Sequence, residues 1–564
     1  MSNLKKWKIA LLLSLTISFS VLAFFKLFPK EILDITNSNW ILGNSPASLD
    51  LAQSTAGQNA FIGSPWNFPP GNLTNLGSSI HNSLLFSDTT PWFAYFVKAW
   101  DSLFGLPTGA LQFVGIQVLI TIVLLWVSVA LYVYWETKSI SVSVLSSCLI
   151  GTLPHFLIQW WAPSVMFQFL IVVATWLYRA FPIQSQKQRI IYWTSLFFFT
   201  SLTHSYFVPM VGVIFLASVA NSFRRKDQRG DIYMLAKVST GSLLLGQFLA
   251  GGFSVGISGS ATGVKDYGSW SADVFAFFNT RGLSSFFPGF ASLPSMGGFG
   301  YAGASVIFLV GVSGLWRFLE YLQRKRLLAT TNQHRKRKAK SSTKPVVNAW
   351  KNLIYGCAIL LLVAIGPSMT ILGKHYWITQ NESILQVASI FRSSGRFLWP
   401  SLIIFPLWAV IYLKSRRRLL TPVFLIAVLI VQAIEFAPAL TGQKSAIVDV
   451  LKDTPQRIPA ITEAFNDANE VIYFPGFPSP ATAPWRNYLI DFVRRGGNVV
   501  NFAYANRFNG SDMTASNEAV NLMISNGTIS SGTIFIVESN SGMTLRQKSS
   551  FLGTIADWEY YYVE

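Results

Sequence analysis

Cysteine is nearly absent from this chain, with only Cys148 and Cys357 among 564 residues, and both fall in apolar segments. Two such residues exclude a disulfide framework and a cysteine-based metal site. The five histidines are scattered without zinc-like spacing. The chain also lacks the Walker-type and dinucleotide glycine patterns. The sequence therefore gives no motif for a nucleotide-dependent or zinc-dependent soluble enzyme.

Charged residues are scarce as well, at 12%, whereas 51% of the residues are hydrophobic and the mean hydropathy is +0.41. This composition is typical of a polytopic membrane protein. The net charge of +19 could suggest a nucleic-acid partner in a soluble protein. Here the basic residues gather in short loops between apolar runs, so we predict membrane lipids and no nucleic acid as partners.

Apolar runs of membrane length predict about 11 transmembrane spans. The first, 7–27, is too long for the apolar core of a signal peptide and is interpreted as an uncleaved span. The other runs are 110–134, 139–159, 163–180, 190–205, 206–222, 233–257, 301–320, 353–373, 397–413 and 420–437. The runs at 190–222 are separated only by "THSYFVP" and could be short or re-entrant.

The basic loops predict the orientation. With Lys5, Lys6 and Lys8 inside, every basic cluster falls on the cytoplasmic side, including 323–344 and "KSRRR" at 414–418. An odd number of spans then puts the C-terminus outside. We interpret 323–344 as a cytoplasmic loop that fixes the topology and contacts anionic lipid.

The chain divides into a transmembrane domain, 1–440, and a polar C-terminal domain, 445–564, which we expect on the outer face. Two long outer loops are predicted, at 28–109 and 258–300. In the C-terminal domain we expect strands at 470–476, 498–504, 533–539 and 558–564, and a helix at 485–497 that ends at glycine. The fold class is therefore an α-helical membrane protein carrying a small α/β domain.

Two arginines in "SIFRSSGRFLWP", Arg392 and Arg396, precede the tenth predicted span and so lie outside. Lys374 and His375 are expected at the same face, at the end of the ninth span. Cations there oppose the usual charge bias, and guanidinium binds phosphate bidentately. The spacing of four predicts that both arginines share one helical face and hold a lipid phosphate. The alternatives are snorkelling to ordinary headgroups and a salt bridge to a carboxylate.

The first outer loop contains few carboxylates. Asp50 lies a little past the first span, and Asp88 precedes a predicted amphipathic surface helix at 89–103. Either aspartate could be a helix N-cap or a catalytic base. The surface helix is expected to direct Trp92, Phe93, Phe96 and Trp100 toward lipid. In the second outer loop, Asp266 and Trp270 stand among aromatic residues that suit sugar rings and suit packing on the membrane equally well.

Five blocks carry a resemblance to a family: "SPWNFPPG" (64–71), "SLLFSDTTPWFAYFVK" (83–98), "LTHSYFVPM" (202–210), "GGFGYAGASVIFL" (297–309) and "FRSSGRFLWP" (391–400). In this order they resemble a largely uncharacterised bacterial family of polytopic membrane proteins near the GT-C glycosyltransferases. The layout, with many spans, a long first outer loop and an outer domain, is similar to that of GT-C enzymes as a class.

The resemblance implies an inverting glycosyltransferase of the bacterial cytoplasmic (inner) membrane. It would move a sugar from a polyprenyl-phosphate donor to a glycan, lipid or protein acceptor of the envelope. Asp50 matches the early acidic position and Asp88 the "FSD" position, as candidate bases. Gln53, Trp66, His204 and Tyr206 lie in or beside the matching blocks, and with Asp266 and Trp270 they are the implied substrate-binding residues. Where the family more typically has Asp-Pro and a Gln-His pair, this chain has "LAQSTAG" after Asp50.

Some GT-C enzymes use a divalent metal and others do not. Because few carboxylates cluster here, we predict no metal and no cofactor. Two other classes stay open: a lipid or glycan flippase or transporter, and a non-catalytic scaffold for envelope assembly. Coupled transporters usually carry ionisable residues within their spans. Here only Glu435, Lys237, His155 and His204 approach that condition, each near a span end.

Overall fold

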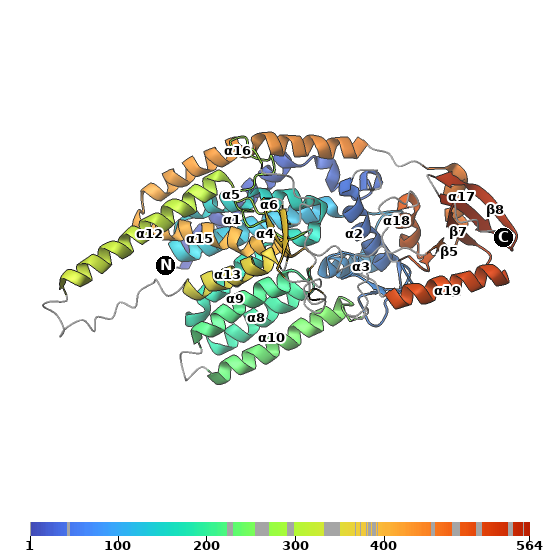
Figure 1. Cartoon of the computed structure of the whole chain (residues 1–564), viewed down its shortest axis with the longest axis horizontal. Coiled ribbons are helices and arrows are strands. Elements are labelled where there is room, and N and C mark those ends of the chain that lie inside the picture. The colour runs from blue at the N-terminus through green and yellow to red at the C-terminus, as the bar shows by residue number, and fades with distance from the viewer. Residues whose placement is uncertain are drawn as a thin grey trace.

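The structure, a computed structural model, is an elongated bundle of long helices with a small sheet domain at one end (Figure 1). The N-terminus lies at the end of the bundle remote from that domain, and the C-terminus lies within it. The residues described are 2–41, 46–222, 229–253, 270–289, 298–331, 350–366, 368–372, 374–378, 381, 385, 391, 393–452, 457–475, 486–502, 510–539, 545–555 and 558–564.

Each of the predicted apolar ranges contains a helix. These helices are α1 (Ser2–Leu27), α4 (Val114–Thr137), α5 (Ile140–Gly151), α7 (Phe169–Ala180), α8 (Gln186–Ser201), α9 (Phe207–Ser222), α10 (Arg229–Leu249), α12 (Ala304–Thr331), α13 (Lys351–Ile365), α15 (Trp399–Arg416) and α16 (Leu420–Lys452). Most present apolar side chains on every face, as helices buried in a bundle or in lipid do.

Seven helical segments among the described residues are long and apolar enough to cross a membrane, or eight if one bent pair is a single span. The bent pair joins α5 to residues 154–161 at an angle of 55°. The helices α9 and α13 are apolar but shorter. The ninth predicted span, 353–373, is only partly helical. The helix α13 ends before Gly366, whose φ is +71°, and strands β3 (Ser368–Ile371) and β4 (Lys374–Trp377) then form a hairpin.

The first outer loop folds into two helices, α2 (Pro46–Gly63) and α3 (Pro91–Phe104), with a short hairpin of β1 (Asn72–Leu73) and β2 (Asn82–Ser83) between them. Helix α3 confirms the predicted surface helix. Proline at its first position and a glycine cap with φ of +73° suit its two ends. Its exposed stripe consists of Phe96, Trp100, Leu103 and Phe104. The expectation for Phe93 was wrong, because its ring is buried against Phe113.

The C-terminal domain contains a five-stranded sheet in the order β6-β5-β7-β9-β8. Its strands are β5 (Glu470–Phe474), β6 (Asn498–Val499), β7 (Thr533–Glu538), β8 (Ser549–Ile555) and β9 (Trp558–Val563), and its helices are α17 (Pro459–Asp467), α18 (Arg486–Arg494) and α19 (Gly510–Asn526). The three strands β6, β5 and β7 are parallel, and β9 and β8 are antiparallel additions. The sequence did not predict β8, which lacks the alternation of a half-buried strand.

The first outer loop holds this domain against the bundle. Leu76 forms a parallel bridge to Val499 at the free edge of β6, and the Asn75 amide donates to the Val493 carbonyl at 2.8 Å. The Arg494 guanidinium pairs with Asp101 of α3 at 3.0 Å. A covered sheet edge removes a site for unwanted strand pairing. The loop and the sheet domain are therefore joined by direct contacts.

A buried carboxylate fixes the second outer loop to the bundle. Glu435 of α16 is fully buried, and it accepts hydrogen bonds from the Tyr301 hydroxyl at 2.5 Å, the Ser284 hydroxyl at 2.7 Å and the Ala304 backbone N–H at 2.9 Å. The last of these lies at the first residue of α12, where a negative charge suits the helix N-terminus. These three donors explain why a carboxylate can be buried at position 435.

Candidate functional site

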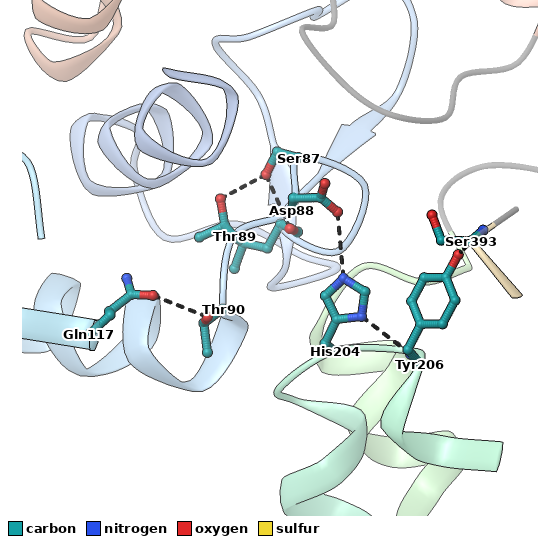
Figure 2. Close-up of polar contacts among 9 residues, drawn as sticks. Ser87, Asp88, Thr89, Thr90, Gln117, His204, Tyr206 and Ser393 are labelled. Carbon is teal, nitrogen blue, oxygen red and sulfur yellow. Dashed lines mark hydrogen bonds and ion pairs between the residues drawn. The ribbon is translucent and has the colours of Figure 1, made fainter. Parts of the chain in front are cut away.

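Asp88 lies in a tight turn that connects β2 to α3. Its φ is +55°, a left-handed conformation that aspartate tolerates better than most residues. The N-cap of α3 is Thr90, which makes no side-chain cap hydrogen bond. The interpretation of Asp88 as an N-cap was therefore wrong. Its carboxylate points away from α3 and toward His204, with Oδ1 3.6 Å from Nε2 (Figure 2).

The turn is held against α2 by close packing. The Thr89 hydroxyl donates to the Ser54 carbonyl at 3.0 Å. A Cβ on Gly57 would lie only 2.2 Å from the Ser87 Oγ, so this helix position has no room for a side chain. The glycine lets α2 and the turn approach each other, and this contact sets the position of Asp88.

His204 and Tyr206 lie in the short break between α8 and α9. The Tyr206 backbone N–H donates to His204 Nδ1 at 3.2 Å. Because a backbone N–H can only donate, Nδ1 is an acceptor and the neutral ring carries its proton on Nε2. That proton faces Asp88. The Tyr206 ring stacks on the imidazole at a centroid distance of 5.3 Å, and its hydroxyl accepts from the Ser393 N–H at 2.7 Å.

Arg396 contacts the Tyr206 ring, with its Cζ 4.8 Å from the ring centroid. It belongs to the 3₁₀ helix η10 (Ser394–Leu398), which leads into α15. Its Nε is buried without a hydrogen-bond partner among the described residues, while the side chain as a whole is partly exposed. Arg396 forms no ion pair with any described residue. A buried donor of this kind calls for a partner such as water or an anion.

The four side chains form a continuous series from guanidinium to carboxylate. The Arg396 Cζ lies 4.8 Å and the His204 ring centre 5.3 Å from the Tyr206 ring centre, so these two groups are at most about 10 Å apart, and Asp88 contacts the imidazole at Nε2. A cation that can hold an anion and a carboxylate that can accept a proton therefore lie in one cluster.

The other candidate base, Asp50, is inside α2, which begins at Pro46, so Asp50 is not its N-cap. It stands one turn before Ser54, on the helix side that faces the Asp88 turn. Gln53 is buried on the same helix. Both residues therefore belong to the helix that packs against Asp88.

The remaining predicted residues have separate surroundings. Trp66 is exposed and stacks on Tyr95 at 6.2 Å. The carbonyl of Trp270 accepts from the Gly395 N–H at 3.1 Å, which places the second outer loop beside Arg396. Lys374 is exposed in the β3–β4 hairpin and forms no ion pair with a described residue. Asp266, Arg392 and the His375 side chain lie outside the described residues.

The predicted shared helical face of Arg392 and Arg396 stays a prediction, because Arg392 lies outside the described residues. Among the described residues, the 3₁₀ helix begins at Ser394, and Ser393 has a non-helical backbone with φ of −87° and ψ of 61°. Sequence reasoning overlooked Gly57, whose only visible signal is a glycine inside a helix.

The described residues contain no group of three or more His, Cys, Asp or Glu side chains that could hold a metal ion. The site as described consists of one carboxylate, one imidazole, one phenol and one guanidinium. Such a set can accept a proton and hold an anion.

Comparison with known proteins identifies the family. Residues 17–437 match the model of a family described as "Domain of unknown function (DUF6311)". The chain belongs to this family. The matched part contains Asp50, Asp88, His204 and Arg396, whereas the C-terminal sheet domain lies beyond it.

No curated protein matches this DUF6311 chain. Among solved structures it is similar to the crystal structure of ArnT from Cupriavidus metallidurans bound to undecaprenyl phosphate. The TM-score is 0.41 and the sequence identity 9%, with 100% of this chain and 98% of that chain covered.

Proposed function

We propose that this chain is a membrane glycosyltransferase of the GT-C kind, which moves a sugar from a polyprenyl-phosphate carrier to an envelope acceptor on the outer face. The observation that carries the proposal is Arg396, a partly buried cation without a carboxylate partner among the described residues. The guanidinium contacts the Tyr206 ring, the Tyr206 ring stacks on His204, and His204 lies beside Asp88. A phosphate ester with a sugar attached would satisfy both ends of this series.

The residues suggest a division of roles. The acceptor hydroxyl would give its proton to the Asp88 carboxylate while its oxygen forms a bond to the anomeric carbon. The bond from that carbon to the phosphate oxygen breaks, and the polyprenyl phosphate leaves with the electron pair. Arg396 would stabilise the phosphate charge. A single in-line displacement inverts the anomeric carbon.

His204 would act as a positioning residue. Its Nε2–H faces Asp88 because Nδ1 is occupied by the Tyr206 N–H. This keeps the carboxylate directed toward the imidazole and away from α3. Tyr206 in turn is held by the Ser393 backbone N–H, three residues before Arg396 in the chain. The positions of the base and of the phosphate-binding cation are therefore coupled.

A coupled transporter fits the described residues less well. Transport by proton coupling needs an ionisable side chain in a span that can exchange its proton. Glu435 is tied to three donors and fixes the second outer loop. A non-catalytic scaffold would need the C-terminal domain to dock on the bundle. It would not need an Asp–His pair near a cation that has no carboxylate partner among the described residues.

The test is sugar transfer by the full chain in proteoliposomes, with a panel of polyprenyl-phosphate sugars as donors. Asp88→Asn keeps the shape of the base but removes its proton affinity, so transfer should fall by about two to four orders of magnitude. Asp34→Asn is a matched control, since Asp34 is an exposed residue of the same outer loop whose carboxylate accepts from Thr36, two residues along the chain.

Asp50→Asn decides between the two candidate bases. If Asp50→Asn abolishes transfer while Asp88→Asn does not, the base is Asp50. If both variants transfer at the wild-type rate, neither is the base and the proposed mechanism is wrong. A wild-type chain that binds the carrier but transfers from no donor would favour the scaffold.

A further inference from the structure

A second candidate site lies between the middle of α12 and the last turn of α15, away from the Asp88–Arg396 site. A cavity of about 610 Å³ opens there. Its apolar wall consists of Val312, Leu315 and Leu319, one face of α12 at helical spacing. Leu315 and Leu319 are 60% and 49% exposed, so the groove is open to its surroundings along this wall.

The rim of the groove is basic. The Arg416 guanidinium pairs with Glu320 at 2.9 Å, which neutralises the one carboxylate of the lining. Arg417 forms no ion pair with a described residue, and its guanidinium stacks on Trp316 with Cζ 5.0 Å from the ring. The stack fixes the guanidinium plane at the mouth of the groove. Within the described part of the chain, the positive charge of Arg417 is therefore left without an acidic partner beside an apolar wall.

We propose that this groove binds an anionic phospholipid of the cytoplasmic leaflet. The acyl chain would lie along Leu315 and Leu319, and the phosphate would accept from Arg417. The charge supports this occupant, since the adjacent chain supplies further cations at Arg324 and Lys325 and the groove has no unpaired described acid. Tryptophan is enriched at the depth of the lipid headgroups, which suits Trp316 beside a phosphate site.

The position in the fold supports a lipid over a soluble ligand. The groove is formed by two helices that are long and apolar enough to cross a membrane, just where their basic ends begin. The basic loops predict that this end is cytoplasmic. In Figure 1 the C-terminal end of α12 points away from the sheet domain. The site is thus independent of the Asp88–Arg396 site and of the function proposed for it.

The test is native mass spectrometry of the full chain in detergent with added phosphatidylglycerol or phosphatidylcholine. The wild type should retain phosphatidylglycerol in preference to phosphatidylcholine. Arg417→Ala should lower the apparent affinity for phosphatidylglycerol about tenfold, because one charge-assisted pair is lost. Arg417→Lys keeps the charge but not the planar guanidinium, so it should lose less affinity for phosphatidylglycerol than Arg417→Ala does.

Arg418→Ala is the matched control, because it removes an equal charge next to the groove from a residue outside its lining. It should retain the lipid nearly as the wild type does. Equal losses in Arg417→Ala and Arg418→Ala would mean general charge attraction and would overturn the site. So would equal retention of the two lipids by the wild type. A monodisperse elution profile for each variant shows that a loss does not come from misfolding.

Discussion

The direction of the Asp88 side chain follows from its backbone conformation. With φ of +55°, the residue turns its side chain out of the path of α3 and toward a histidine from a distant part of the chain. In an ordinary extended conformation the same carboxylate would stand before the helix N-terminus, where aspartate is a common cap. The left-handed turn therefore converts a residue that looks like a cap into one that faces a candidate site.

Lys98 is the residue that joins α3 to the end of α2. It is 3% exposed, and its Nζ donates to the carbonyls of Phe61 at 2.7 Å, Ser64 at 2.9 Å and Pro65 at 3.2 Å. Lys98→Met keeps the length of the side chain but leaves these carbonyls without their donor. We expect a loss of about 2–4 kcal/mol in the free energy of unfolding, measured in detergent by chemical denaturation.

The burial of Lys98 also predicts that the stability of the folded chain depends on pH. Burial lowers the pKa of Lys98 from 10.5 to about 8. Between these two values the unfolded chain binds more protons at this group than the folded chain, so its contribution to stability rises with pH. The stability difference between the wild type and Lys98→Met should therefore widen from pH 8 to 10.5. A difference that narrows over this range would contradict the assigned surroundings of Lys98.

At the scale of elements, the packing of α2 on the Asp88 turn decides the geometry of the site. Gly57→Ala would bring a Cβ to 2.2 Å from the Ser87 Oγ and 2.7 Å from the Thr89 Oγ1, so the turn must shift. If Asp88 is the base, a shift of about 1 Å should lower transfer about 100-fold.

Gly212→Ala in α9 is the matched control, since a Cβ there meets nothing within 4 Å. It should keep transfer and gain slightly in stability, because alanine favours the helix. Transfer by Gly57→Ala at the rate of Gly212→Ala would show that this contact does not position the reacting groups.

Elements were predicted from the sequence where local patterns determine them. Apolar length located the long helices, and the runs of β-branched and aromatic residues at 470–476, 533–539 and 558–564 became β5, β7 and β9. The break of α13 into a hairpin was missed, because 353–373 is apolar throughout. The site was predicted only in part: His204 and Arg396 were candidates, but their stacking on Tyr206 depends on contacts between segments far apart in sequence, which a single sequence does not reveal.

At the scale of the whole molecule, the account requires the sheet domain and the groove beside Arg417 to lie on opposite sides of the membrane. Ser78 in the first outer loop and Ser415 at the end of α15 are both exposed. We expect an impermeant thiol reagent to label Ser78→Cys in intact cells and to label Ser415→Cys only after permeabilisation.

The unaltered chain is the control, because its two cysteines are buried or half-buried. Labelling of Ser415→Cys in intact cells, with none at Ser78→Cys, would invert the topology and place Arg396 on the cytoplasmic side.

The central claim, that Arg396 receives the phosphate of a polyprenyl carrier, is tested most directly by binding. The affinity of the full chain for polyprenyl phosphate can be measured without knowing the sugar or the acceptor. Arg396→Ala should weaken binding by about 2–3 kcal/mol, or 30- to 150-fold, with the elution profile unchanged. Arg418→Ala, at the other end of the bundle, should leave it unaltered. Equal affinity of the wild type and Arg396→Ala for polyprenyl phosphate would contradict the account.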